Sequence, residues 1–297
     1  MSGLVALGLQ NLYEKKIPLV TTFHTLALMK NLVARDENER ETEKRIDTET
    51  ELIKRSNIIT ASSRTDREYL ISLYDCPRTK VEVITPGVDT NLFHRIDKRD
   101  AAMHLNENPS QKIIMFVGRI EPLKGIDVLM YALKIYLKRN PNSELKLMII
   151  GGSSHERTTN YELERLKELQ HTLRIHPAVE FIPQQSQSAL PYYYNYADIV
   201  VMPSHYESFG MTTLEAMACG TSIIATDTSG VSSIFDRELK NLTISANNPL
   251  LLANQIESVL NKPKKHKILQ EKVMRKAQAM NWENVAKKLL TIYKIIT

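Results

Sequence analysis

The feature that most constrains the fold of this 297-residue chain is an alternation of short apolar runs with segments of helical periodicity. The runs are rich in β-branched residues and nearly continuous, as in KIIMFVG at 112–118, which is typical of strands in a parallel sheet covered on both faces. Strands are predicted at 17–23, 56–62, 80–86, 112–118, 145–152, 178–183, 198–203 and 221–227. Helices are predicted at 3–15, 39–55, 64–74, 124–139, 160–174, 188–196, 210–219, 249–261, 265–279 and 283–296. The pattern predicts an α/β fold.

A polar stretch at 95–110, without a strand pattern, divides the alternation into two sets. Each set predicts a doubly wound parallel-sheet domain, the first at 1–97 and the second beginning at residue 98. Such domains bind ligands at the carboxyl ends of their strands. The first set contains only three predicted strands and opens with a helix at the initiator methionine. The first domain is therefore either minimal or incomplete.

Composition narrows the class of protein. Hydrophobic residues make up 42% and charged residues 25%, as in globular chains. Only two cysteines occur, Cys76 and Cys219, which favours a reducing, cytoplasmic compartment over a disulfide framework or a zinc cluster. No apolar run approaches the roughly 18 residues of a membrane helix. The net charge of +5 indicates either anionic ligands or an ordinary basic surface, and no pattern of nucleic-acid recognition is present.

The stretch HYESFGMTTLEAMACG at 205–220 joins a predicted strand end to a helix. The first amides of a helix lack internal partners and favour an anion, and Gly210 lets a ligand approach the backbone closely. Glu215, one turn into the helix, is placed to accept hydrogen bonds from a ribose, and Glu207 to reach a sugar beyond the phosphates. The alternative is a plain loop acid followed by a glutamate favoured by the helix dipole.

Two cations follow the strand at 112–118, within FVGRIEPLKG. Arg119 and Lys124, in a turn that begins at Gly118, suit a diphosphate, because a guanidinium pairs with two oxygens and an ammonium acts as a point charge. The alternative is a positively charged turn. His24, directly after the strand at 17–23, is either a ligand for a sugar hydroxyl or a core histidine.

These motifs together resemble the retaining glycosyltransferases of family 4. The resemblance rests on Glu207 and Glu215 in their spacing, GRIEPLKG, TFHTL at 22–26, PGVD at 86–89 and NWENVAKKLL at 281–290, and it covers nearly the whole chain. HTLALMKN is most similar to the branch that holds sucrose-phosphate synthases and the enzyme that adds N-acetylglucosamine to inositol phosphate. The family implies a GT-B fold, in which two doubly wound domains face a cleft.

The resemblance also implies roles for particular residues. The second domain, 98–280, would bind the nucleotide-sugar donor, and 281–297 would form a helix that crosses back onto the first domain. Residues implied in catalysis are His24, Glu207, Arg119 and Lys124. Residues implied in donor binding are Gly118, Arg119, Lys124, Glu207, Ser208, Phe209, Gly210, Met211 and Glu215. Thr25 and Arg45 match positions that face an acceptor phosphate, although Arg45 could instead pair with Glu41 or Glu49 on its own helix.

The implied reaction transfers a hexosyl unit with retention from a nucleotide-diphosphate sugar, taken as UDP-linked from the similar branch, to an acceptor hydroxyl. The acceptor would be a sugar, a sugar phosphate or a lipid-linked molecule, which leaves a peripheral membrane contact open. No Asp-x-Asp stands near the motifs, so no cofactor or essential metal is expected; Arg119, Lys124 and the helix amides would neutralise the leaving diphosphate.

Family members carry about 100 further residues at the amino end, including a glycine-rich loop. Their absence predicts a truncated chain, and an incomplete sheet favours an oligomer or a completing chain. The alternative function is therefore a non-catalytic remnant or subunit that binds the nucleotide sugar. Two smaller departures are Ser208, where many members have proline, and 228–230, where they have more glycine. The sequence disfavours a nicotinamide dehydrogenase, because no strand is followed by Gly-x-Gly-x-x-Gly.

Overall fold

The computed structural model describes residues 2–13, 17–34, 37, 40–152, 156–235 and 239–296. The chain divides into two compact units. The first unit comprises 1–87 with 282–297, and the second comprises 88–281. The boundary lies earlier than the expected one after residue 97, because Val88 and Phe93 are buried in the core of the second unit.

The first unit is a small parallel sheet with order β1-β2-β3. Its elements are α1 (Ser2–Leu12), β1 (Val20–Thr22), α2 (Ala27–Val33), α3 (Glu43–Arg55), β2 (Ile58–Ala61), α4 (Arg64–Tyr74), β3 (Val81–Val83) and α13 (Trp282–Ile296). The three predicted strands are present and the pairing is parallel, with Thr21 opposite Ile59. Helix α2 was not predicted, because a helix of seven residues is too short to give a clear periodic pattern.

The second unit holds a six-stranded parallel sheet with order β6-β5-β4-β7-β8-β9. Its strands are β4 (Ile113–Val117), β5 (Lys146–Ile150), β6 (Val179–Ile182), β7 (Ile199–Met202), β8 (Ser222–Thr226) and β9 (Thr243–Ile244). Its helices are α5 (Lys98–Leu105), α6 (Ile126–Arg139), α7 (Glu156–Thr172), α8 (Leu190–Tyr196), α9 (Met211–Ala218), α10 (Ser229–Ile234), α11 (Pro249–Asn261) and α12 (Pro263–Ala279). The predicted α/β class with two parallel sheets is confirmed.

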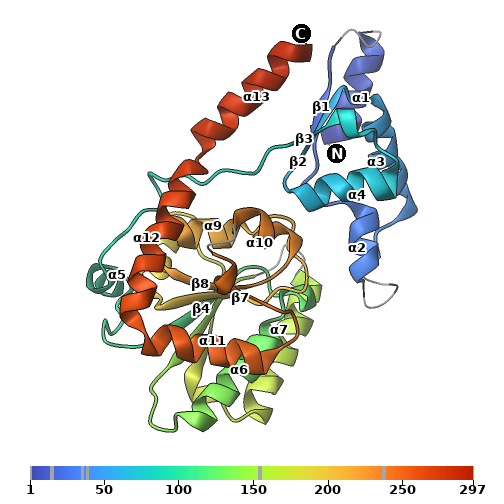
Figure 1. Cartoon of the computed structure of the whole chain (residues 1–297). Coiled ribbons are helices and arrows are strands. Elements are labelled where there is room, and N and C mark those ends of the chain that lie inside the picture. Colours follow the sequence, from blue (N-terminus) through green and yellow to red (C-terminus); the bar gives the residue numbers. More distant parts are fainter. Residues whose placement is uncertain are drawn as a thin grey trace. The chain divides into compact units, whose positions relative to one another are not determined.

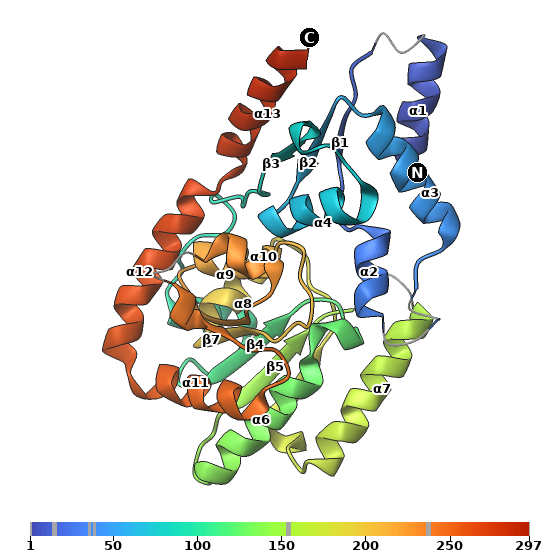
Figure 2. The same ribbon diagram turned by 45° about the vertical axis from the view of Figure 1, so that its right-hand side comes forward.

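Helices cover both faces of the larger sheet. Helix α6 contacts α7 and α11, while α9 contacts α8 and α12; in Figures 1 and 2 the sheet lies between these two layers. Strands β4, β5, β7 and β8 are almost completely buried, which explains their continuous apolar sequences. The fold is doubly wound, as the alternation predicts.

The strand order reverses between β4 and β7. Strand β4 pairs with β5 on one side and with β7 on the other, where Ile114 is opposite Ile199. The helices that follow β4 and β7 lie on opposite faces, so the carboxyl ends of these two strands mark the switch point, where doubly wound folds bind ligands. The motifs GRIEPLKG and HYESFG are the loops that leave these two strand ends.

Three elements of the second unit were not predicted. Helix α5 lies in the polar stretch at 95–110, where Asp97 caps it by accepting a hydrogen bond from Arg99 N. Its apolar face is mainly Ala101 and Ala102, both buried, and two small residues give little periodicity to read. Helix α10 and strand β9 are also too short for a pattern.

In the part of the chain that the structure describes, no helix has the length and apolar character needed to cross a bilayer. Cys76 and Cys219 are free thiols, and both are buried. Helix α13 buries Val285 and Ile292, and Ile292 lines, with Ile58 and Val83 of the same unit, a hollow of about 460 Å3.

Candidate functional site

The loops that leave β4 and β7 interlock through their backbones. His205 N donates a hydrogen bond to Leu123 O at 2.9 Å. Gly125 has φ 62°, and a Cβ there would lie 2.3 Å from Pro203 O. Only glycine can therefore hold this close approach. The two sequence motifs form one structural element, although they are far apart in the chain.

Lys124 and Glu207 form an ion pair at the centre of this element. Lys124 Nζ lies 2.7 Å from Glu207 Oε2, and the two side chains are 13% and 16% exposed. A partly buried pair of this kind depends on both partners, because either charge left alone would be poorly solvated. The structure thus brings together two of the predicted site residues.

The amino end of α9 is open to an anion. Its capping residue, Gly210, has φ 87° and makes no side-chain cap hydrogen bond. Thr212 Oγ1 donates to Val117 O at 3.2 Å, which ties the first turn of α9 to the end of β4. The first amides of a helix have no partner within the helix, and together with the helix dipole they favour negative charge beside the turn that carries Lys124.

Gly230 supports the loop that carries Glu207. Gly230 N donates to Glu207 O at 2.9 Å, and a Cβ at Gly230 would lie 2.5 Å from both Glu207 O and Phe209 N. One glycine in the segment 228–230 is therefore sufficient for this contact, although the family pattern has more. Nearby, the hydroxyls of Ser204 and Thr228 are buried without a hydrogen-bond partner.

Glu215 lies on α9 with only 6% of its surface exposed. Its Oε2 accepts a hydrogen bond from the hydroxyl of Tyr194 at 2.7 Å. Burial raises the pKa of the Glu215 carboxyl to about 7 from an ordinary 4.5, although the bond from Tyr194 acts in the opposite direction. Glu215 is therefore a buried carboxyl held by a neutral partner.

Arg119 does not join this cluster. Its guanidinium pairs with Glu121 at 2.7 Å, and 54% of its side chain is exposed. Of the remaining predicted donor residues, Ser208 exchanges a hydrogen bond with the Tyr206 hydroxyl at 3.0 Å, and Phe209 is buried. Gly118 follows β4 and donates to Ile150 O at 3.0 Å.

His24, Thr25 and Arg45 lie together in the first unit. All three line a pocket of about 730 Å3 formed with residues of α1 and α3. His24 is exposed, so it is not a core histidine. Arg45 Nη2 donates to Thr25 Oγ1 at 3.0 Å, which joins the two residues expected to face an acceptor.

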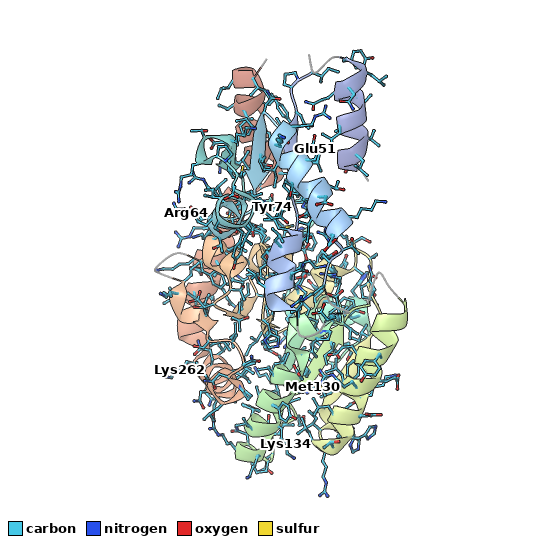
Figure 3. All side chains as sticks on the ribbon, turned by 90° about the vertical axis from the view of Figure 1, so that its right-hand side faces the viewer. Glu51, Arg64, Tyr74, Met130, Lys134 and Lys262 are labelled. Atoms are coloured by element: carbon cyan, nitrogen blue, oxygen red, sulfur yellow. The ribbon has the colours of Figure 1, made fainter. Side chains whose placement is uncertain are left out.

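Arg45 is also engaged by acids of its own helix and the turn before it. It pairs with Glu41 at 2.6 Å and with Glu49 at 2.9 Å, as the alternative interpretation stated. Glu49 in turn accepts from Ala27 N at 2.8 Å and from the Tyr74 hydroxyl at 2.5 Å. Tyr74, labelled in Figure 3, lies at the end of α4. The network fixes the start of α2 against α3 and α4.

Among the described residues, no group of three or more histidine, cysteine or acidic side chains is arranged to hold a metal ion. The charged groups at the switch point are instead the Lys124–Glu207 pair and Arg119.

A doubly wound sheet with unpaired helix amides and a cation at its switch point is the architecture of nucleotide-binding proteins. Comparison with known families narrows this class. Residues 97–276 match the family described as glycosyl transferases group 1, and residues 1–92 match glycosyltransferase family 4. The chain therefore belongs to glycosyltransferase family 4, a family of retaining glycosyltransferases, as the motifs predicted.

Similarity to individual proteins supports the same family. The chain is 32% identical over 296 residues to a D-inositol 3-phosphate glycosyltransferase of Frankia alni, covering 99% of this chain and 72% of that protein. It is 31% identical over 281 residues to the enzyme of that name from Rhodococcus jostii, covering 95% of this chain. The chain spans 62% of the Rhodococcus protein's length.

Solved structures share the fold. A sucrose-phosphate synthase from Thermosynechococcus elongatus aligns with a TM-score of 0.83 and 26% identity, covering 99% of this chain and 71% of that one. Anabaena HepE, solved in complex with UDP and glucose, aligns with a TM-score of 0.81 and 18% identity, covering 97% of this chain and 74% of that one. The second likeness establishes the fold alone, which is GT-B-like.

Sequence reasoning missed the supports of the site. Gly125 and Gly230 were not assigned any role, although a glycine at each position is required by backbone contacts. Tyr194 lies outside the motifs named from the sequence. It is fully buried, but its hydroxyl bonds Glu215. No local sequence pattern predicts that hydrogen bond, because the two residues lie on different helices.

Proposed function

We propose that this chain is a retaining hexosyltransferase that takes its sugar from a nucleotide-diphosphate donor bound by the second unit. The observation that carries the proposal is the junction of the loops after β4 and β7, where the Lys124–Glu207 pair stands beside the uncapped start of α9. This junction lies at the switch point of the sheet, where doubly wound folds bind nucleotides.

The donor's parts would be divided among the groups of this junction. Lys124, the exposed guanidinium of Arg119 and the amides from Phe209 to Met211 would hold the diphosphate and stabilise it as it leaves. Glu215 would accept hydrogen bonds from the ribose. Glu207, which already fixes the ammonium of Lys124, would contact the transferred sugar.

A uridine nucleotide is the proposed donor. One observation supports it: Anabaena HepE, which shares the fold, was solved with UDP and with UDP-glucose. The family branch that the sequence resembles implies the same nucleotide. The hexosyl unit itself is left to the experiment below.

The first unit would supply the acceptor side. Its pocket of about 730 Å3 is lined by His24, Thr25 and Arg45, and relatives are named as enzymes that act on D-inositol 3-phosphate. We propose a phosphorylated polyol or sugar as acceptor, with His24 close to the reacting carbon. An acceptor phosphate would compete with Glu41 and Glu49 for Arg45. A lipid-linked acceptor, with a peripheral membrane contact, stays a prediction, as does a cytoplasmic location.

A second candidate function is donor binding without turnover, through a partner chain that completes the first unit. Its support is the small size of the first sheet, in which β1 pairs on one side only among the described strands. The two candidates share the donor site and differ in whether the chain alone transfers sugar.

Titration calorimetry on the full chain tests the donor site. The measurement gives the affinity of wild type and of Lys124→Ala for each of UDP-glucose, UDP-N-acetylglucosamine, GDP-mannose and ADP-glucose. Lys112→Ala is the matched control, because Lys112 is 61% exposed and pairs with Asp198 at the opposite end of β4. Selective binding that Lys124→Ala abolishes and Lys112→Ala preserves supports the proposal. Equal binding by all three proteins contradicts it. Product formation with inositol phosphate then separates the two candidate functions.

A further inference from the structure

Tyr194 and Glu215 form a buried pair that joins two helices behind the proposed donor site. Tyr194 lies on α8 and Glu215 on α9, and the phenol oxygen is 2.7 Å from Oε2 of the carboxyl. Tyr194 is completely buried. The pair therefore lies on the protein side of the carboxyl, which leaves Oε1 as the oxygen without this contact.

The phenol is held in place by the surrounding chain. Its ring lies 6.0 Å from the ring of Phe93, measured between centroids, and its backbone oxygen accepts from Thr221 Oγ1 at 2.7 Å. The next residue, Asn195, donates to His94 O at 2.9 Å and to Pro191 O at 2.8 Å. Because α8 is fixed by these bonds, the hydroxyl presents its proton to Glu215 from one direction.

Among the described residues, no cation contributes to the pKa of the Glu215 carboxyl. The titratable groups that face it are Tyr194 from α8 and Cys219, which caps the end of α9. Burial and the nearby Glu215 raise the pKa of Tyr194 well above its ordinary value, and the same causes raise the pKa of Cys219 to about 12. Both groups therefore stay neutral, and Tyr194 is the group that donates to the carboxylate.

We propose that Tyr194 is a positioning residue for donor binding, whose hydroxyl holds the Glu215 carboxylate in its charged form and in the orientation that offers Oε1 to the ribose hydroxyls. This inference rests on the proposed role of Glu215 in the donor site. Tyr194 is buried and lies outside the motif that carries the two glutamates. By this inference it nevertheless affects the affinity for the nucleotide sugar and the dependence of that affinity on pH.

The sign of the effect follows from the chemistry. A ribose hydroxyl donates to a carboxylate, so donor binding requires the ionised form and weakens as the pH falls through the pKa of Glu215, about 7. Removing the Tyr194 hydroxyl takes away the hydrogen bond that favours ionisation of Glu215. The fall in donor affinity, which is the acid limb of the binding profile, therefore moves to higher pH. The loss of one bond to a charged group corresponds to an affinity change on the order of tenfold or more at pH 7.

Tyr194→Phe tests the proposal, with Tyr196→Phe as the matched control. Tyr196 is on the same helix and equally buried, but its hydroxyl donates to Asn108 O at 3.0 Å. Affinity of the full chain for whichever of the four nucleotide sugars binds most tightly is measured from pH 6 to 9. The diphosphate diester of a nucleotide sugar does not titrate in this range. We expect Tyr194→Phe to bind about tenfold more weakly at pH 7 and to recover at pH 9, with Tyr196→Phe unchanged.

A pH profile of Tyr194→Phe that coincides with wild type overturns the inference. Glu215→Gln separates this outcome from failure of the proposed function: if that variant binds the nucleotide sugar like wild type, or if wild type binds none of the four, the donor site itself is wrong. Should Tyr194→Phe not fold, site-specific replacement of Tyr194 by 3-fluorotyrosine keeps the shape and strengthens the donor. The binding limb should then move to lower pH, and an unmoved limb overturns the inference.

Discussion

Replacing Glu215 by glutamine should stabilise the second unit above neutral pH. Burial raises the pKa of the carboxyl to about 7 from 4.5. Between these two values the folded chain keeps a proton that the unfolded chain has already lost, so the free energy of unfolding falls as the pH rises. Each pKa unit corresponds to about 1.4 kcal/mol, so the ionised carboxyl costs on the order of 3 kcal/mol above pH 7.

Glutamine cannot ionise, and its amide oxygen can still accept the bond from Tyr194. Glu215→Gln should therefore be more stable than wild type by up to about 3 kcal/mol at pH 8 and nearly equal to it at pH 4.5. For a unit of this size the gain at pH 8 corresponds to roughly 5–10 °C in the unfolding temperature. The same variant should lose donor affinity, because a carboxylate oxygen that accepts from the ribose has been replaced.

Thermal and urea unfolding of the full chain at pH 5 and pH 8 measure this effect. Glu144→Gln is the control, since Glu144 is an exposed glutamate of the same unit, and it should change little at either pH. A Glu215→Gln variant that is destabilised equally at both pH values would refute the reasoning. In that case the Glu215 carboxyl would stabilise the fold, and a role in ligand binding would not be needed to explain why a glutamate stands there.

Three further substitutions probe the site. Arg119→Ala should weaken donor binding without changing the unfolding temperature, since the side chain is 54% exposed; a destabilised variant would show that the ion pair is structural. Lys124→Ala should lower both donor affinity and stability, the latter by about 3 kcal/mol, because it removes the ammonium that pairs with the partly buried Glu207 carboxylate; unchanged urea unfolding would contradict this. Gly230→Ala should shift the Glu207 loop and weaken donor binding, whereas Gly8→Ala, where a Cβ meets nothing within 4 Å, should be neutral or stabilising by roughly 0.5–1 kcal/mol. Similar calorimetric curves for the two glycine variants would contradict the loop contact.

The sequence was sufficient for the architecture because parallel strands buried on both faces leave a continuous apolar pattern. The apolar pattern also places Lys124 and Glu207 after strand ends, and the topology explains why residues 83 positions apart form a pair. Helix α5 was missed because its buried face consists of small residues in a charged segment.

The supports of the site could not be predicted from local pattern. The requirement for glycine at residues 125 and 230 depends on backbone atoms of distant segments. The bond from Tyr194 depends on the packing of α8 against α9. Arg45 could be anticipated, because the helix predicted at 39–55 contains both Glu41 and Glu49, and the structure contains both ion pairs.

The most direct test of the account is thermal unfolding of the 297-residue chain with each of UDP-glucose, UDP-N-acetylglucosamine, GDP-mannose and ADP-glucose. A ligand at about 100 times its dissociation constant stabilises the folded state by about 2.7 kcal/mol. The account predicts a cooperative transition that a uridine nucleotide sugar raises in wild type and fails to raise in Lys124→Ala. A cooperative transition that none of the four nucleotide sugars shifts would contradict the claim that this chain holds a donor site.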